Sequence, residues 1–291
     1  MSDIEVKFIG DDQELQRPAL DLLARCFEVW AERKRVFGKF PFRELSFIAF
    51  DGDIACGHLG IIPLESFAED GSIIRLAGVA SVAVIPEYRK RGVAGKMCEA
   101  ASLWAQENGF DAMPLYTSVM RVYEKSSWTV FPVEMQTLKA PEITTGSENL
   151  WKSSAALSEE EKAFIVKCYE NMPPLPGRII RVTDAYAANS WQRLFSKDNL
   201  LWHLAPQGYI LAVDNVIGEV CGKVESFPAG VNKTFLSIHD AAYCQLVNCG
   251  WQKDLPPQAL QECWDGEVAM MKIFHPEKIP AKLFFPLANK F

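Results

Sequence analysis

The chain has 291 residues, 49% of them hydrophobic, and a formal net charge of −7. This length fits about two domains, and the charge argues against nucleic-acid binding, which needs clustered Lys and Arg. No apolar stretch approaches the ~18 residues of a membrane span, and the acidic N-terminus lacks a secretory-signal pattern. We therefore expect a cytoplasmic protein that binds neither nucleic acid nor membrane; whether it forms a homo-oligomer stays open.

The first 140 residues alternate between strand-like and helical patterns. Asp51-Gly52-Asp53 separates two apolar runs and predicts a hairpin. The sequence predicts strands over 4–9, 45–50, 54–64, 73–85, 112–116 and 128–136, and helices over 18–29, 92–109 and 119–125. This order predicts an α+β fold with a mixed, mostly antiparallel sheet and helices on both faces.

The second half follows a polar stretch, 141–154, which predicts a linker. A capping-box pattern at Ser158 begins a predicted helix over 158–169, and a second helix is predicted over 184–195. A hairpin within 202–225 turns at Asp214-Asn215, and strand-like runs follow at 234–238, 267–274 and 283–287. We therefore expect two domains, 1–140 and 150–291, with an acceptor site near their interface.

The eight cysteines are scattered and are expected to be reduced, mostly buried thiols. A metal site at His239, Cys244, Cys249 and Cys263 is the alternative. Structural zinc sites generally use closer pairs, roughly two to four residues apart. We therefore expect no metal.

The most informative segment is a strand that runs into a basic, glycine-bearing turn, which then begins a helix. Small residues leave backbone N–H groups uncovered for phosphate oxygens, and the helix N-terminus adds a partial positive charge. The candidate cofactor-binding residues are Val82, Ala83, Val84, Arg89, Lys90, Arg91, Gly92, Val93, Ala94, Gly95 and Lys96. The alternative is a solvated turn before an ordinary surface helix. The P-loop and dinucleotide-binding glycine motifs are both absent.

Arg89-x-x-Gly92-x-Ala94 after this strand resembles the acetyl-CoA signature of the GNAT N-acetyltransferase superfamily. The downstream segment 122–128 resembles the family's Tyr-Glu-Lys-x-Gly-Phe element, with Ser127 in place of the usual glycine. The resemblance implies a GNAT fold for residues 1–140 and acetyl-CoA as the cosubstrate. It also implies that the strand splays at a bulge and that backbone groups of 82–84 pair with the pantetheine arm. The N–H groups of 92–96 would hold the pyrophosphate.

Acetyl transfer to an amine must remove a proton from an ammonium with a pKa near ~10.4, stabilise an oxyanion and protonate the leaving thiolate. The resemblance implies Tyr123 as the general acid, and packing of its ring is the alternative. A strand N–H near Val84 is the candidate oxyanion donor. The general base stays open between Glu65, His58 and a chain of water molecules.

The second half is similar to tandem-GNAT proteins of the enhanced intracellular survival type, in which a degenerate second unit follows the active one. The resemblance lies in 191–195, 202–204 and 208–211. No second Arg-x-x-Gly-x-Ala loop follows residue 150, so this half is not expected to bind acetyl-CoA. The chain is too short for the third domain of these relatives, in which a terminal carboxylate acts as base; transfer of that role to Phe291 stays open. Trp191, Trp202 and Tyr209 are either walls of an acceptor pocket or core aromatics.

We thus expect an acyltransferase that moves the acetyl group of acetyl-CoA to a primary amine of a small-molecule or polyamine-like acceptor. Acylation of a protein N-terminus or lysine is one alternative. A non-catalytic CoA-binding regulator is another. The sequence does not name the acceptor.

Overall fold

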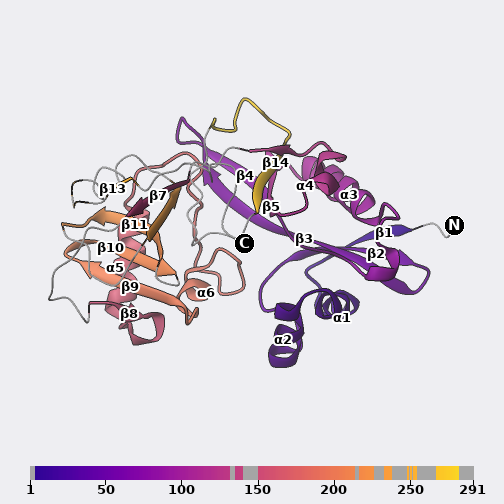
Figure 1. Cartoon of the computed structure of the whole chain (residues 1–291), viewed down its shortest axis with the longest axis horizontal. Coiled ribbons are helices and arrows are strands. Elements are labelled where there is room, and N and C mark those ends of the chain that lie inside the picture. The colour runs from indigo at the N-terminus through magenta and orange to yellow at the C-terminus, as the bar shows by residue number, and fades with distance from the viewer. Residues whose placement is uncertain are drawn as a thin grey trace.

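The computed structural model describes residues 4–131, 135–139, 150–213, 216–225, 233–237, 248, 250, 252–253 and 267–281. Two seven-stranded sheets lie side by side in two lobes (Figure 1). The metal alternative at 239–263, the Asp214-Asn215 turn, the predicted strand at 283–287 and Phe291 lie outside the described residues.

The first sheet has the strand order β1-β2-β3-β4-β5-β14-β6. Its strands are antiparallel to their neighbours except β4 and β5, which are parallel. They span β1 Glu5–Gly10, β2 Leu45–Asp51, β3 Ile54–Phe67, β4 Ile73–Val84, β5 Ala112–Thr117, β6 Thr129–Val130 and β14 Val268–Ile273. The predicted hairpin between β2 and β3 is confirmed.

Helices cover both faces of this sheet (Figure 1). They are α1 Arg17–Cys26 and α2 Glu28–Phe37 on one side, and α3 Val93–Glu107 and α4 Met120–Glu124 on the other. The 3-10 turn η1, Pro86–Tyr88, leads from β4 toward α3. The buried face of α3, with Val93, Met97 and Ala101, packs in the core between helix and sheet. The predicted mixed fold is therefore confirmed.

The second sheet has the order β13-β7-β12-β11-β10-β9-β8. Its strands are β7 Met135–Lys139, β8 Lys152–Ser153, β9 Leu200–Ala205, β10 Gln207–Val213, β11 Val216–Lys223, β12 Lys233–Ser237 and β13 Gln252–Lys253. The turn η2, Ser154–Ala156, and the helices α5 Glu159–Glu170 and α6 Trp191–Phe195 accompany them. The capping box at Ser158 is present at the start of α5, as predicted.

Each sheet contains one strand from the other half of the sequence. β14 pairs with β5 over its whole length and with β6 at Met270 and Met271, so it lies inside the first sheet. β7 pairs with β12 and β13 in the second sheet. The sheets therefore do not divide the chain at the boundary expected between 1–140 and 150–291.

Three predicted elements differ from the structure. The helix predicted over 18–29 ends at Cys26, because Phe27 has an extended backbone, and α2 follows as a separate helix. The strand predicted over 128–136 is two strands in two sheets. The helix predicted over 184–195 begins only at Trp191, where Ser190 accepts a capping hydrogen bond from Arg193.

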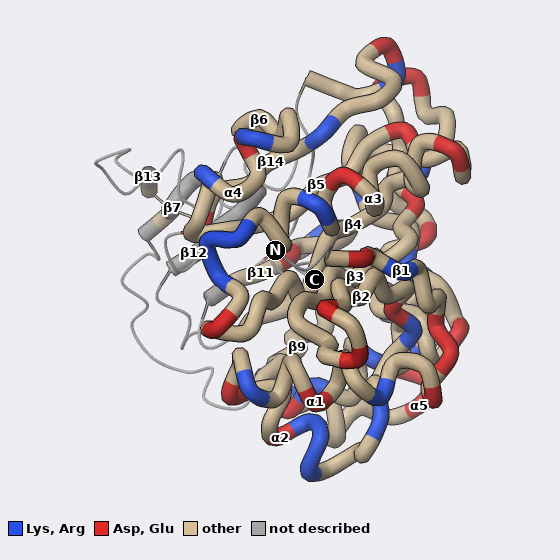
Figure 2. Tube along the Cα trace, turned by 90° about the vertical axis from the view of Figure 1, so that its right-hand side faces the viewer, with Lys and Arg blue, Asp and Glu red and all other residues tan. Residues whose placement is uncertain are grey.

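Acidic and basic residues are interleaved on the side of the molecule seen in Figure 2, so the net negative charge is not gathered there in one patch. Five cysteines within the described ranges are free thiols. Over the same ranges, no helix is long and apolar enough to cross a membrane, and no cluster of three potential metal ligands occurs.

Candidate active site

β4 and β5 diverge after a single pair. Their register joins Leu76 to Ala112, and no further pair links the rest of the two strands. On its other edge β4 stays paired with β3, with an irregularity opposite 58–60, where Ser81 has a positive φ of 53°. The predicted bulge and splay are therefore confirmed, and the second half of β4 presents one edge without a strand partner.

Val84 directs its backbone groups to this open edge. The Ile85 N–H donates to the Cys56 carbonyl of β3, and backbone groups alternate in direction along a strand. The Val84 N–H and C=O therefore point away from β3, and the carbonyl accepts a hydrogen bond from Arg89 Nε at 3.1 Å. Val82, two residues earlier, has the same orientation by this alternation, whereas Ala83 is buried.

The N-terminus of α3 lies next to this edge and has no cap. Gly92 precedes the helix with a left-handed φ of 81°, and a Cβ there would meet nothing within 4 Å. The first bond within the helix runs from the Lys96 N–H to the Gly92 carbonyl, so the N–H groups of 93–95 have no intrahelical acceptor. The first turn holds no acidic side chain and no side-chain cap. These features favour an anion at the helix N-terminus.

The four predicted cations are exposed, and three of them have contacts within the chain. Arg89 reaches the Val84 carbonyl, the Arg91 guanidinium lies 4.8 Å from the centre of the Tyr88 ring, and Lys96 Nζ donates to the Ile4 carbonyl at 3.3 Å. Lys90 has a positive φ of 64°. Arg89, Lys90 and Arg91 thus lie together at the start of α3, while the Lys96 ammonium is held toward the beginning of β1.

Tyr123 of α4 is buried at 8% exposure, with its ring at 6.1 Å from that of Trp128 in an edge-to-face contact. The side chain of Thr117, at the end of β5, lies near this phenol. Burial raises the pKa of Tyr123 above its ordinary value, the nearby Cys98 adds to this effect, and Thr117 acts to lower the pKa. The phenol therefore keeps its proton at neutral pH, as a general acid must.

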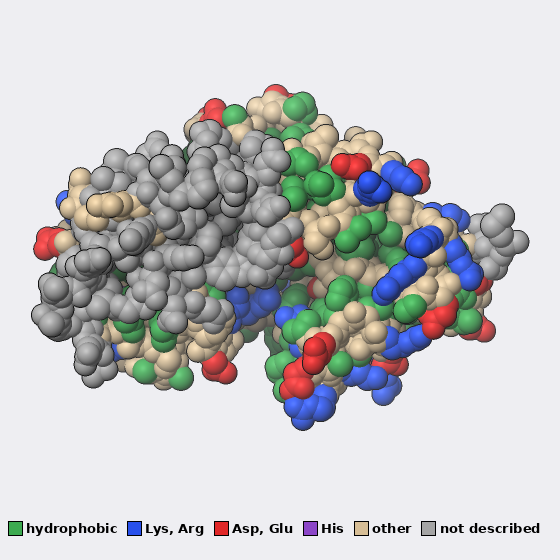
Figure 3. Space-filling view, in the orientation of Figure 1, with side chains coloured by type: hydrophobic (Ala, Val, Ile, Leu, Met, Phe, Trp, Pro, Cys, Tyr) green, Lys and Arg blue, Asp and Glu red, His purple; other side chains and the backbone are tan. Residues whose placement is uncertain are grey.

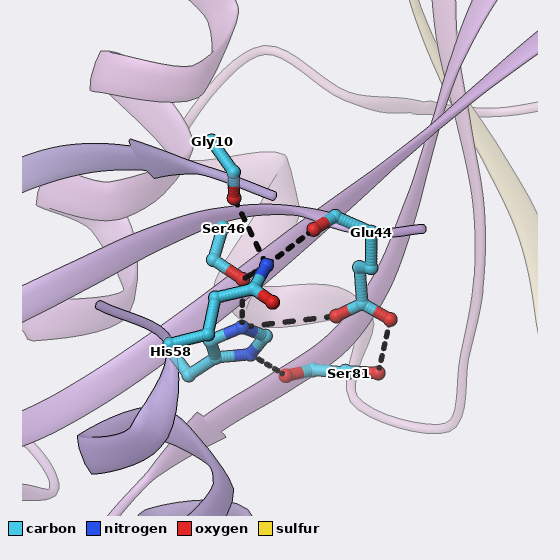
Figure 4. Close-up of polar contacts among 6 residues, drawn as sticks. Gly10, Glu44, Ser46, His58 and Ser81 are labelled. Carbon is cyan, nitrogen blue, oxygen red and sulfur yellow. Dashed lines mark hydrogen bonds and ion pairs between the residues drawn. The ribbon is translucent and has the colours of Figure 1, made fainter. Parts of the chain in front are cut away.

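Sequence reasoning did not single out Glu44, which is completely buried directly before β2. Its Oε2 accepts a hydrogen bond from Ser81 Oγ at 3.2 Å, and its Oε1 has no hydrogen-bond partner (Figure 4). A Cβ on Gly60 would collide with the carboxylate, so glycine at that position makes the room. Burial raises the pKa of Glu44 to about 7, against the opposing effects of Ser81, Arg33 and Arg193.

A buried polar network holds this carboxylate in place. Gln16 Nε2 donates to the backbone carbonyls of Glu44 and Gly10 and to Ser46 Oγ, at 2.5, 2.9 and 2.9 Å (Figure 4). His58 Nε2 lies 3.0 Å from Ser46 Oγ, and Nδ1 lies 2.8 Å from the Ser81 carbonyl. Since a carbonyl only accepts, Nδ1 carries the proton and Nε2 accepts from Ser46. The network therefore ties the loop before β2 to the bulge of β4.

The two base candidates from the sequence have different environments. His58 is completely buried, and burial lowers its pKa to about 4, so its ring is neutral and a weak base. Its 3.7 Å approach to Glu44 Oε1 is therefore not an ion pair at neutral pH. Glu65 is exposed on β3, where its backbone carbonyl accepts from the Ile180 N–H. Of the three residues, Glu44 is the one whose carboxylate contacts the bulge.

Trp191, Trp202 and Tyr209 belong to the core of the second lobe, with exposures of 3%, 0% and 0%. Tyr209 donates to Glu219, which also pairs with Arg181 through both carboxylate oxygens. These aromatic side chains therefore act as core residues.

Residues 11–131 match the model of the acetyltransferase (GNAT) domain. This part of the chain is therefore a GNAT acetyltransferase domain, and the predictions of a GNAT fold and of an acyltransferase are confirmed.

Three solved structures are similar to the whole fold. A GCN5-related N-acetyltransferase from Anabaena variabilis aligns with a TM-score of 0.58 and 16% identity, over 92% of this chain and 73% of that chain. Eis1 from Mycobacterium abscessus aligns with a TM-score of 0.60 and 13% identity, over 94% and 74%. A GCN5-related N-acetyltransferase from Kribbella flavida gives 0.55 and 14%, over 94% and 71%. At these identities the likeness shows a shared fold. No match is found among curated proteins.

Proposed function

We propose that the chain transfers the acetyl group of acetyl-CoA to the primary amine of a small-molecule acceptor. The observation that carries this proposal is the open edge of β4, which leads to the uncapped N-terminus of α3 and faces β5, the strand that the buried Tyr123 follows in the chain. The pyrophosphate of the cosubstrate would need the helix N-terminus, its extended pantetheine amides would need the open strand edge, and its thioester would need a proton donor.

The cosubstrate would bind along this path. The N–H groups at the start of α3 would hold the pyrophosphate, with Arg89, Lys90 and Arg91 neutralising its charge. The pantetheine amides would pair with the open edge at Val82 and Val84, in place of the contact that Arg89 now makes with the Val84 carbonyl. The Lys96 side chain would contribute less, because it is directed to Ile4.

Glu44 would accept the proton of the ammonium through Ser81. The Ser81 hydroxyl can take a proton from the amine while it passes its own to Glu44 Oε2. An amine with a pKa near ~10.4 gives up its proton more readily to a group titrating near 7 than to an ordinary carboxylate. The raised pKa of Glu44 therefore suits this role.

The amine nitrogen would then attack the thioester carbonyl, so that a C–N bond forms and the C–S bond breaks. A β4 N–H at the open edge, that of Val84 or Val82, would donate to the tetrahedral oxyanion. The departing thiolate would take the Tyr123 phenolic proton, because the raised pKa keeps that proton available. The second proton of the amine nitrogen would be lost to water as the amide forms, and water would return a proton to the Tyr123 phenolate. The products are the N-acetylated acceptor and CoA.

Turnover of acetyl-CoA against a panel of amines, followed by release of the thiol, tests this proposal. We expect acetylation of at least one small amine, with loss of turnover in Glu44→Gln and Tyr123→Phe. Acetylation of peptide lysines or N-termini alone would instead support a protein acceptor. A protein that binds CoA and acetylates no amine would be a regulator, and the proposal would be wrong.

A further inference from the structure

Basic side chains from both halves of the chain meet between the two lobes: Arg33 and Arg193 at one aromatic ring, with Lys197 near enough for their charges to act on it. Arg33 comes from α2, Arg193 from α6, and Lys197 follows α6. Both guanidinium groups lie over the Phe42 ring, at 5.8 Å for Arg33 and 4.1 Å for Arg193. Figure 3 shows Lys and Arg side chains in the hollow between the two lobes. The two sheets thus bring positive charge together at one place.

Within the described part of the chain, no Asp or Glu carboxylate lies within ion-pair distance of Arg33, Arg193 or Lys197. Other basic side chains do have such a partner: Lys34, Arg43, Arg181 and Lys278 each lie within 2.8 Å of a carboxylate oxygen. The Arg193 guanidinium donates one hydrogen bond, to the Ala188 carbonyl at 2.8 Å. Burial, followed by the charges of Arg193, Arg181 and Arg33, lowers the pKa of Lys197 to about 8. Like charges held together in a half-buried place repel, and an anion would relieve that repulsion.

The cluster lies beside the proposed base. The charges of Arg33 and Arg193 both act on Glu44, and Phe42, which carries the two guanidinium groups, is two residues before it. Over the described residues, Glu44 is the acid whose charge acts on both Arg33 and Arg193, and its carboxylate accepts a hydrogen bond from Ser81 in the bulge. An acceptor in the hollow would therefore meet positive charge at one end and Glu44 with Ser81 at the other.

We infer that the acceptor is an amine that also carries an anionic group, a carboxylate or a phosphate, bound by Arg33, Arg193 and Lys197. The inference rests on the proposed acetyl transfer, and it makes the second half of the chain part of the acceptor site. Paired guanidinium groups suit planar or tetrahedral oxyanions. A polyamine-like acceptor would instead bring further positive charge to these cations.

The test compares four acceptors of similar length: 4-aminobutanoate, its amide, 3-aminopropyl phosphate and 1,4-diaminobutane. We expect the carboxylate or the phosphate to give a kcat/KM about 10- to 100-fold above that of the amide, as for a charge-assisted contact. Arg193→Gln and Lys197→Met should remove this preference by raising KM for the carboxylate and the phosphate, so that their kcat/KM falls to that of the amide in the same variant. Lys167→Met, an exposed position on α5, is the matched control.

A second measurement does not depend on turnover. Butanoate and inorganic phosphate should raise the Tm of the wild type and of Lys167→Met, and not that of Lys197→Met. Without ligand, Lys197→Met should be at least as stable as the wild type, because removing the lysine removes repulsion; this separates binding from folding. A preference for the amide or diamine, or an anion effect that survives in Lys197→Met, would overturn the inference. If no amine is acetylated but the anions raise the Tm of the wild type and not that of Lys197→Met, the anion site is supported and the proposed acetyl transfer is wrong.

Discussion

Replacing Glu44 with glutamine should change activity and stability in opposite directions. Glutamine keeps the size of the side chain and its place over Gly60, but it cannot accept a proton. If Glu44 is the base, kcat should fall by about 10²-fold or more. The ionisation near pH 7 should also disappear from the pH dependence of kcat/KM.

The stability effect follows from the pKa. Glu44 has a pKa of about 7 in the folded chain against 4.5 as a free side chain, so the folded state holds this proton more tightly. The resulting stabilisation is fully present below pH ~4.5 and is lost as the pH rises through about 7. At about 1.4 kcal/mol per pKa unit, the loss is roughly 3 kcal/mol. Glu44→Gln lacks this loss, so at high pH its unfolding free energy should rise relative to that of the wild type by the same amount.

Urea unfolding at pH 5 and pH 8 measures this difference, and acetyl-CoA turnover measures the activity. Glu65→Gln is the matched control, because it removes an exposed carboxylate on the neighbouring strand and should change neither quantity. Equal pH dependence of stability in Glu44→Gln and wild type would show that Glu44 titrates normally. Full activity in Glu44→Gln would remove it as the base.

Substitutions at three further positions test separate parts of the structure. Gly92→Glu should abolish acetyl-CoA binding in calorimetry, whereas Gly92→Ala, which shares the left-handed strain of about 1–2 kcal/mol but adds no charge, should bind within a few-fold of wild type. Tyr123→Phe should lower kcat about 10²-fold with acetyl-CoA affinity unchanged; steady-state kinetics within threefold of wild type would leave Tyr123 a packing residue. Glu219→Gln should lower the unfolding free energy by about 3–5 kcal/mol in urea, because it leaves Arg181 as an uncompensated buried charge.

The features predicted correctly depend on local sequence. The strand, turn and helix around Gly92 are contiguous in the sequence. The left-handed backbone of Gly92 and the positive end of the helix follow from local sterics and from the helix dipole. The hairpin at Gly52 and the capping box at Ser158 are equally local. Such signals need no knowledge of the rest of the fold.

The features that were missed depend on contacts far apart in sequence. Glu44 precedes an apolar run and looks like a surface residue at a strand end; its burial comes from the space at Gly60 and the bulge at Ser81. An acid directly before a mostly apolar strand was the available signal, but it does not reveal which residues surround that acid. The sequences of β7 and β14 do not reveal that each strand belongs to the sheet of the other half, because a strand has the same residue pattern in either sheet.

The position of β14 has a consequence for how the chain is made. β5 ends at Thr117, and its main partner, β14, begins only at Val268. On its other side β5 holds a single pair with β4, since the two strands diverge after Leu76 and Ala112. At synthesis rates of about 5–20 residues per second, β5 would leave the ribosome roughly eight to thirty seconds before the strand that covers it. During that interval the nascent protein carries an uncovered, apolar strand edge of the kind that pairs with other chains. The splay that leaves β4 with an open edge thus also leaves β5 exposed to aggregation until residues Val268–Ile273 have been made.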